Sequence, residues 1–404
     1  MMTQHAWFAA RSAAWLAAAS AILGCGDGAA GDGDAGAVAT GAKYAVSSAV
    51  FGPEGTTSAV SILDSVGVQQ IDYERAWVFP GWADMWVRDG DVFVSDGESP
   101  VITKFTVADD GGLVEAGRLS FATYGQVDAA FWSNTFVSPT KAYMINGTAE
   151  YVIWNPAAME ITGTLALPAL EARDGLVVRA GTLDRSNVIR DGLLYQPMYW
   201  SDEDYTQFSP DSRIVVIDVA SDQVVRVIEA PCAGLDVGTQ DAAGDLYFST
   251  WTSGVYSPLV LGTEPNCVAR IGAGETTATA AFTFASIAGG REGAAVRAAS
   301  DGRLLLSIFH DDRVDLAGAS DPWELIGQDN WRLWSYDPAT GAASPIESVD
   351  WNSGATYMFE IDGRTHVLVP AADAASSRVY ALDGVDGTPL FDTRGWAMRL
   401  FKVR

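Results

Sequence analysis

The stretch ADMWVRDGDVFVSDGESPVITKFTVADDGGLVEAGRLSF, residues 83–121, decides the fold. It contains short runs of β-forming residues separated by turn-forming residues, at 83–88, 91–96, 101–108 and 113–121. The Asp89-Gly90 pair between the first two runs is a strong hairpin signal, because both residues tolerate the positive φ angles of a two-residue turn. The stretch therefore predicts four antiparallel strands in one sheet. A single sheet leaves one face unburied, so it needs partners.

Similar units recur along the whole chain. Hairpin turns repeat at intervals of roughly 50 to 60 residues, at Asp89-Gly90, Pro139-Thr140, Asp191-Gly192, Gly244-Asp245, Asp301-Gly302 and Asp362-Gly363. A second turn follows in each unit, at Asp64, Asp109, Asn155, Asp218, Gly272, Asp337 and Asp383. Seven second turns and six hairpin turns predict seven sheets, one of which lacks its first strand.

The C-terminal segment supplies the missing strand. Residues 396–403 (WAMRLFKV) form a strand-like run without partners, and the first unit, 44–79, has only three strands. Pairing the two closes a ring and removes open sheet edges. We predict an all-β fold, a seven-bladed β-propeller of four-stranded antiparallel blades, with its ring closed by the C-terminal strand joining the N-terminal blade. Six or eight blades remain alternatives. The expected blades are 44–79 plus 396–403, 83–121, 128–168, 182–229, 233–285, 293–350 and 354–394.

The N-terminus is typical of an exported protein. An apolar run from Ala9 to Leu23 ends in Ile22-Leu23-Gly24-Cys25, which resembles the cleavage box of bacterial lipoproteins. We predict a lipoprotein-type signal peptide (1–24), a lipidated Cys25, a disordered Gly/Ala/Asp tether (25–42) and the propeller (43–404). The alternative is an ordinary secretory signal. The expected location is the outer membrane, periplasmic or surface-facing, with membrane contact through the lipid anchor only.

Cys232 and Cys267 are the cysteines that remain after Cys25. An even pair in an exported protein predicts a disulfide, with two free buried thiols as the alternative. Cys232 falls in the linker entering the fifth unit, and Cys267 falls at the end of that unit's long loop. A bridge would pin the loop against the rim.

The formal net charge of −26 excludes non-specific nucleic-acid binding, because such a surface repels phosphates. The acidic runs 202–204 and 311–315 lack the spacing of a calcium loop, so Ca²⁺ is only a weak alternative and the cofactor stays unknown. No nucleophile elbow, phosphate loop or His-rich metal motif occurs. The sequence gives no positive sign of catalysis, although paired carboxylates remain open.

Three successive long loops point to a site on one face of the ring. They span 199–211, 251–266 and 310–330, and they are rich in aromatic and acidic residues. Arginine suits anionic ligands through its planar fork of donors, and aromatic rings suit stacking. The candidate ligand-binding residues are Trp82, Trp132, Arg185, Trp200, Trp251, Tyr256, Arg297, His310, Trp323 and Arg399. The alternative is that these arginines pair with carboxylates and these aromatics pack between blades.

The segment Phe121–Gly147 (FATYGQVDAAFWSNTFVSPTKAYMING), together with the blades and the lipoprotein box, resembles bacterial surface lipoproteins encoded beside siderophore and iron-uptake systems, including the myxochelin-cluster type. The resemblance covers one blade clearly and the others by architecture. It implies a propeller that binds or hands over a ferric chelate, or that supports an outer-membrane receptor. It carries no catalytic motif.

These observations favour a lipid-anchored propeller that binds a small anionic ligand, such as a ferric siderophore, in support of iron uptake. The first alternative is a propeller enzyme, a lyase or hydrolase acting on a sugar or lactone. The second is a scaffold for protein–protein interaction at the outer membrane.

Overall fold

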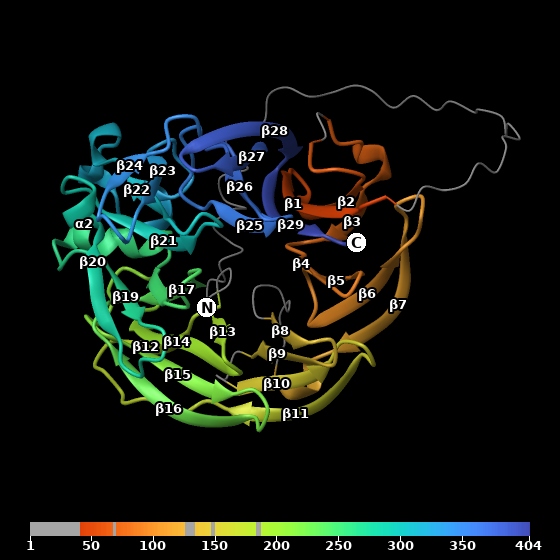
Figure 1. The fold of residues 1–404 in the computed structure, drawn as a ribbon, viewed down its shortest axis with the longest axis horizontal. Helices are drawn as coiled ribbons and strands as arrows, with labels where there is room; N and C mark the ends of the chain where they lie inside the picture. Colours follow the sequence, from red (N-terminus) through yellow and green to blue (C-terminus); the bar gives the residue numbers. More distant parts are fainter. Residues whose placement is uncertain (1–40, 68–69, 126–133, 147–149, 183–186) are drawn as a thin grey trace, which may run out of the picture.

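The computed structural model describes residues 41–67, 70–125, 134–146, 150–182 and 187–404. They form seven antiparallel sheets arranged as blades around a central axis (Figure 1). The predicted seven-bladed β-propeller is therefore confirmed. The six- and eight-bladed alternatives are wrong.

Blade one combines the two ends of the chain. From the channel outward, its strands are β29 (Trp396–Lys402), β1 (Tyr44–Gly52), β2 (Gly55–Leu63) and β3 (Trp77–Pro80). Strand β29 pairs antiparallel with β1 from Tyr44↔Lys402 to Ala49↔Trp396. The predicted closure by the C-terminal strand is confirmed.

Blades two and three follow the chain outward from the channel. Blade two contains β4 (Met85–Arg88), β5 (Asp91–Ser95), β6 (Val101–Val107) and β7 (Leu113–Ser120). Blade three contains β8 (Asn134–Ser138), β9 (Lys141–Ile145), β10 (Glu150–Asn155) and β11 (Glu160–Ala166).

In blade four, two short strands, β12 (Val177–Ala180) and β13 (Val188–Arg190), share the inner position by pairing with different parts of β14. The remaining strands of this blade are β14 (Leu193–Ser201), β15 (Ser212–Asp218) and β16 (Gln223–Ala230).

Blades five to seven return to the simple order. Blade five contains β17 (Leu235–Gln240), β18 (Leu246–Thr250), β19 (Cys267–Ile271) and β20 (Thr279–Thr283). Blade six contains β21 (Gly293–Ala298), β22 (Leu304–Phe309), β23 (Trp331–Tyr336) and β24 (Ala343–Pro345). Blade seven contains β25 (Tyr357–Ile361), β26 (Arg364–Pro370), β27 (Ser376–Asp383) and β28 (Asp386–Arg394).

The described helices are all short. They are η2 (Tyr73–Arg75), η3 (Ala122–Tyr124), η4 (Thr252–Val255), η5 (Ser257–Leu261), α2 (Phe284–Ile287), η6 (Asp311–Arg313), η7 (Leu316–Gly318) and η8 (Pro322–Leu325). In the described part of the chain, no helix has the length and apolar character needed to cross a lipid bilayer.

Turn chemistry sets the strand register. Asp89 and Gly90 have φ angles of 52° and 86°, and the strands on either side pair from Arg88↔Asp91 onward. Positive φ at both central residues matches the right-handed twist of the two strands, and Asp and Gly accept it at low cost. The Asp-Gly pairs at 191–192 and 362–363 have the same signs of φ.

The hydrophobic core lies between neighbouring blades. Between blades two and three, Phe93, Phe121 and Phe136 surround the fully buried Trp154, with ring centroids 5.4 to 6.0 Å from its own. The burial of β23 alternates strictly along the strand, as expected for a half-buried strand. Aromatic rings therefore fill the space between these two blades.

The predicted disulfide between Cys232 and Cys267 is present. It joins the linker between β16 and β17 to the start of β19, across a sequence separation of 35 residues. It therefore ties the end of the long β18–β19 loop to the entry of blade five.

Candidate ligand-binding channel

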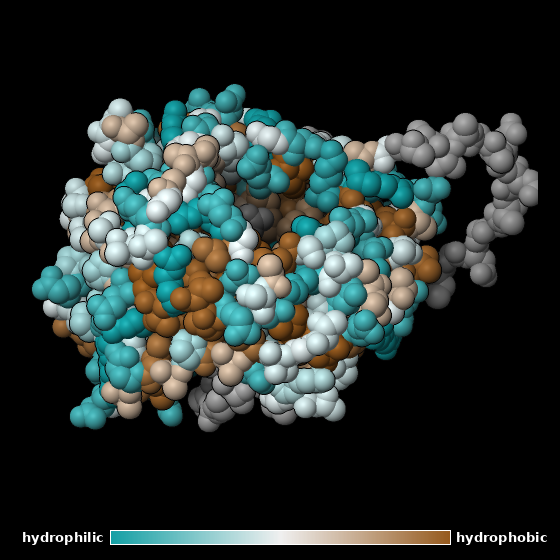
Figure 2. Space-filling view, turned by 60° about the horizontal axis from the view of Figure 1, so that its bottom comes forward, coloured by the Kyte–Doolittle hydropathy of each residue, from teal (hydrophilic) through white to brown (hydrophobic). Residues whose placement is uncertain are grey.

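A cavity of about 480 Å³ occupies the centre of the ring. The innermost strands of all seven blades contribute to its wall. Figure 2 shows the surface hollowed near the middle of the ring. Consecutive residues of the innermost strands line the cavity, such as 134–136 and 238–240, because the edge of each blade borders this space.

Beta-bulges place charged residues along these inner strands. In β21 the register shifts between Ala294 and Arg297, and Ala295 lies at a φ of 56°. In the β1–β29 pair the register shifts between Ser47 and Ser48, which leaves Met398, directly before Arg399, as the extra residue. A bulge adds one residue to a strand and re-aims the side chains beside it, which is common next to binding sites. The two arginines thus line the cavity from blades six and one.

Arg399 forms a buried ion pair across the junction of blades one and two. Its Nη2 donates to Asp84 Oδ2 at 2.6 Å, and the backbone N–H of Met85 donates to Asp84 Oδ1 at 2.8 Å. Arg399 is 4% exposed and Asp84 is 0% exposed. Arg399 lines the cavity whereas Asp84 does not, so the carboxylate supports the guanidinium from behind.

Asp236 occupies the bulge of β17, where the register shifts between Leu235 and Val237. Its Oδ1 accepts from the backbone N–H of Thr182 at 3.0 Å, and its Oδ2 accepts from the hydroxyl of Tyr199 at 3.1 Å. Burial and then the charge of Asp236 raise the pKa of Tyr199 well above its ordinary value. Tyr199 therefore stays a hydrogen-bond donor to this carboxylate.

The remaining wall is polar and aromatic. The charged residues among the described lining are Arg297, Arg399 and the exposed Glu360. Neutral polar lining residues are Asn134, Thr135, Thr182, Asn187, Thr239, Gln240 and Thr365. The aromatic lining residues are Trp86, Phe136, Phe359 and Phe401. Such a wall offers positive charge, hydrogen-bond donors and ring surfaces to one small ligand.

Of the sequence-predicted residues, the structure places Arg297 and Arg399 in the channel wall. Trp82, Trp251 and Trp323 instead pack against the core cluster shared by blades seven and one. The rings of Trp251 and Trp323 lie 5.8 Å apart, between the β18–β19 and β22–β23 loops. These tryptophans are half-buried, and the cavity lining does not include them.

Tyr256 and Trp200 lie within the protein. Tyr256 is 5% exposed and its hydroxyl donates to the carbonyl of Ala319 at 3.4 Å, which joins two of the long loops. Trp200 is 0% exposed, its Nε1 donates to the carbonyl of Glu171, and the Arg173 guanidinium lies 3.6 Å from a Trp200 ring centroid.

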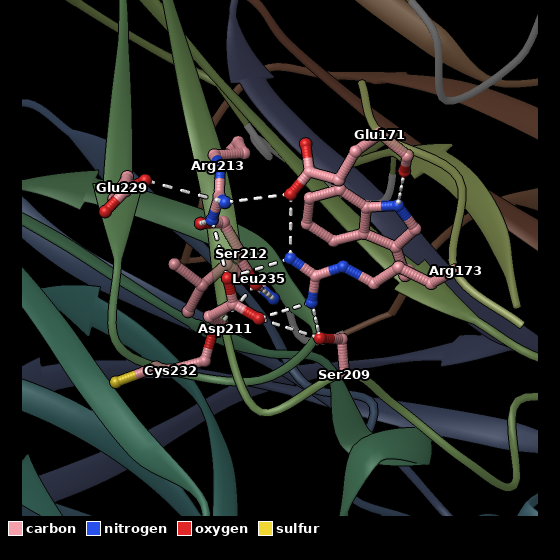
Figure 3. Close-up of polar contacts among 10 residues, drawn as sticks. Glu171, Arg173, Ser209, Asp211, Ser212, Arg213, Glu229, Cys232 and Leu235 are labelled. Atoms are coloured by element: carbon pink, nitrogen blue, oxygen red, sulfur yellow. Dashed lines mark hydrogen bonds and ion pairs between the residues drawn. The ribbon is translucent and has the colours of Figure 1, made fainter.

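Arg173 and Arg213 both lie over the Trp200 ring. Figure 3 shows the ion pairs that these two arginines form. Arg173 and Arg213 each bridge Glu171 and Asp211. Burial opposes the charge of Asp211, but hydrogen bonds from Arg173, Ser209 and Arg213 outweigh it and hold the pKa of Asp211 below its usual range. Arg173 and Arg213 thus pair with carboxylates, which the sequence analysis gave as the alternative to ligand binding for arginines of this chain.

His310 lies in blade six, beside Trp351, and does not line the cavity. Trp132, Arg185 and the lipidation residue Cys25 lie outside the described residues. In the part of the chain that the structure describes, no three His, Cys, Asp or Glu side chains gather as a metal site.

Sequence reasoning missed Asp84, Asp236 and the four lining aromatics. A usable signal exists for the acids, because each interrupts the apolar start of an innermost strand, in WADMWV and in GLDVGT. Arg297 and Arg399 stand in the same way within AAVRAA and WAMRLF. A charge at that point of a blade repeat therefore lies in the channel wall or directly behind it.

No protein-family model and no curated protein matches this chain. Solved structures with a similar fold include a proposed 6-phosphogluconolactonase from Bacteroides fragilis, with 11% identity, 92% of this chain and 100% of that chain covered, and a TM-score of 0.52. The periplasmic gluconolactonase PpgL of Pseudomonas aeruginosa has 15% identity, with 90% and 99% covered and a TM-score of 0.51. A protein from Lactobacillus plantarum has 10% identity, with 90% and 100% covered and a TM-score of 0.50. At these identities the likeness establishes the β-propeller fold and nothing finer.

Proposed function

We propose that this protein binds a small anionic ligand in its central channel through Arg297 and Arg399. The observation that carries the proposal is the placement of two guanidinium groups on one cavity of about 480 Å³ in a chain of net charge −26. Cavities of roughly 300–1,000 Å³ are the usual size for small-ligand sites.

The physical argument rests on desolvation. Arg297 is 3% exposed and Arg399 is 4% exposed, so both charges act across little water. Interactions with charged groups are stronger under those conditions than at a surface. The overall negative potential repels anions elsewhere, which makes the channel selective.

The compartment is part of the proposal. A disulfide such as Cys232–Cys267 is typical of proteins that work in an oxidising environment. We propose that the chain is exported and anchored through a lipid on Cys25, with the propeller presented at the outer membrane. A ferric chelate is the proposed ligand, and an outer-membrane receptor is the proposed partner.

The test is a titration of the purified protein with anionic ferric catecholate, gluconate and neutral glucose, followed by tryptophan fluorescence and calorimetry. Trp86 lines the cavity, so a bound chelate should quench its emission. Arg297→Gln should weaken the binding of an anion by about 10- to 100-fold, since hydrogen bonds to charged groups contribute about 1.5–3 kcal/mol.

Arg297→Lys should retain part of the affinity, because it keeps the charge and loses the fork. The control is Arg118→Gln on the outer strand β7, where the side chain pairs with Glu115 in solvent. Equal affinities for the anions and for glucose, or no change in Arg297→Gln, would refute channel binding of an anion.

The second candidate function is hydrolysis of a sugar lactone. Asp84 and Asp236 lie directly behind the channel wall, and two of the proteins of similar fold bear lactonase names. A colorimetric lactone assay with the Asp236→Asn variant separates this candidate from binding alone. Turnover by the native protein that Asp236→Asn abolishes would favour the enzyme, and no turnover would remove it.

A further inference from the structure

Blade six carries a second group of basic side chains, apart from the channel. Arg291 follows α2 in the linker to β21, Arg313 ends η6, and Arg332 is on β23. They gather around His310 and Trp351. None of these residues lines the central cavity.

Trp351 holds two of the arginines in place. The Cζ atoms of Arg313 and Arg332 lie 4.0 and 4.8 Å from the centroid of the Trp351 ring. The His310 ring meets the same indole edge-on, with centroids 4.7 Å apart and planes at 84°. Stacking on an aromatic face orients a guanidinium while leaving its N–H edges available for acceptors.

The neighbouring acids neutralise this group only in part. Asp312 Oδ1 is 3.6 Å from both Arg291 Nη2 and His310 Nδ1, which exceeds hydrogen-bond length. Glu347 pairs with Arg332. The two acidic side chains are 61% and 71% exposed, so water screens both contacts.

Several buried nitrogens in this group have no hydrogen-bond partner. They are Nε2 of His310, Nε of Arg291, Nε of Arg332 and Nε1 of Trp334. His310 is only 8% exposed, and its ring centroid is 6.4 Å from that of Trp334. Arg332 and Trp334 are two residues apart on β23, so they share a face of the strand. Buried polar atoms in proteins nearly always have a protein or water partner, so this group leaves several nitrogens for a partner that is not part of the chain.

We infer that this blade-six arginine site binds a doubly charged oxyanion, which is a free phosphate or sulfate ion or a phosphate monoester. The carbonyl of Asp329 accepts from Arg313, and Glu347 accepts from Arg332, but three guanidinium groups present more N–H donors than these acceptors satisfy. A tetrahedral oxyanion has enough oxygens to accept from several forks at once. The site is independent of the channel, so either can exist without the other.

His310 supplies a local signal for occupancy. Burial and then the charge of Arg291 lower its pKa, with Arg332 and Arg313 acting in the same direction and Asp312 opposing them. These are the charged groups that face it from the linker, η6 and β23. A bound dianion adds negative charge beside the ring, so it should raise the pKa of His310.

The experiment titrates the full-length protein with inorganic phosphate, sulfate and glycerol phosphate at constant ionic strength, with acetate as the singly charged comparison. Calorimetry measures affinity, and NMR of the His310 ring follows its titration. The double variant Arg291→Gln/Arg313→Gln should weaken phosphate binding at least tenfold and abolish the shift of His310. The matched control is Arg118→Gln/Arg226→Gln, on the outer strands of blades two and four.

Equal responses to acetate and phosphate, or an unchanged affinity in the double variant, would overturn the inference. Arg297→Gln in the channel should leave the His310 signal unchanged, which separates this site from the proposed function. Phosphatidic acid vesicles, whose headgroup is a phosphate monoester, distinguish the sources of the group. Vesicle capture that the double variant loses assigns a lipid headgroup, whereas binding of glycerol phosphate without vesicle capture assigns a soluble ester.

Discussion

At the residue scale, the channel region contains buried charged side chains that a β-propeller does not need in order to fold. Asp84, Asp236, Arg297 and Arg399 are each less than 5% exposed, and all lie at the inner ends of blades. Replacing buried ion pairs by apolar side chains is often neutral or stabilising, so their presence argues for a role beyond stability. The channel proposal gives these residues such a role.

Glu292 provides a test of buried charge that is independent of the channel. It is 7% exposed, and its Oε2 accepts from the backbone N–H of Asn266 at 3.1 Å. Burial raises the pKa of Glu292 to about 7. The folded protein therefore holds this proton up to near neutral pH, whereas the unfolded chain releases it near pH 4.5.

The stability that Glu292 contributes is thus fully present below pH 4.5 and is lost as the pH rises through 7. We predict that Glu292→Gln removes up to about 3 kcal/mol of pH dependence between pH 5 and 8. Urea unfolding of both proteins across this range measures the difference. Glu360→Gln, at an exposed position, is the control, and parallel stability curves for native protein and Glu292→Gln would contradict the prediction.

At the element scale, the entry to the closing strand depends on one glycine. Gly395 separates β28 from β29, has a φ of 70°, and a Cβ there would lie 2.1 Å from the carbonyl oxygen of Ala49. Backbone atoms cannot move away as a flexible side chain does. The close approach of β29 to β1 therefore requires that this residue carry no side chain.

We predict that Gly395→Ala destabilises the protein far more than Gly363→Ala does. Gly363 has a φ of 73° but open space where the Cβ would go, so alanine there costs only the conformational strain of about 1 kcal/mol. Thermal unfolding compares the two variants directly. Similar melting temperatures for both would show that β29 does not need the close contact.

The disulfide is the other feature at this scale with a measurable contribution. It closes a loop with a sequence separation of 35 residues. In the chain-entropy model this restriction of the unfolded chain stabilises the fold by about 3–4 kcal/mol.

We predict that Cys232→Ala/Cys267→Ala lowers the free energy of unfolding by about that amount, measured in guanidinium chloride. Treating the native protein with a reducing agent should reproduce the loss, and the double variant should not respond to it. A native protein whose stability is insensitive to reduction would contradict this account.

At the scale of the whole molecule, the ring is closed by non-covalent contacts between the chain ends. The backbone N–H of Lys43 donates to the carbonyl of Arg404 at 3.0 Å, and that of Val403 donates to the carbonyl of Lys43 at 2.7 Å. Closure also forms the channel, because β29 carries Arg399. Stability and the site therefore depend on the same strand.

We predict that deleting 396–404 prevents cooperative folding, because it exposes the edge of β1 in blade one and the side of blade seven that packs against β29. A circular permutant that links residue 404 to residue 43 and opens the chain in the β6–β7 turn, near 110–111, should fold and keep the affinity of the channel. Circular dichroism and the ligand titration measure both properties. A folded deletion variant with intact binding would contradict the role assigned to β29.

The sequence predicted much of the fold and little of the site. Turn pairs such as Asp89-Gly90 and Asp362-Gly363 are local signals, so blade boundaries followed from spacing. The aromatics at 251 and 323 were expected at a ligand, but they pack between loops, because a large apolar ring gains most where neighbouring elements bury it. Arg297 and Arg399 were expected at an anionic ligand, and both line the channel, while their role in binding stays a prediction.

The sequence by itself determined the all-β class, the seven repeats, the closing strand and the cysteine pair, because periodicity, turn chemistry and spacing are local properties. Tertiary structure decided which of the charged and aromatic residues line the channel and which lie behind its wall, through bulges and packing between blades. It also decided which arginines meet a carboxylate and which gather around Trp351, since those contacts join residues from different strands, linkers and blades. The electrostatic potential at a given place depends on the packing of the whole ring, so it cannot be read from the order of residues along the chain.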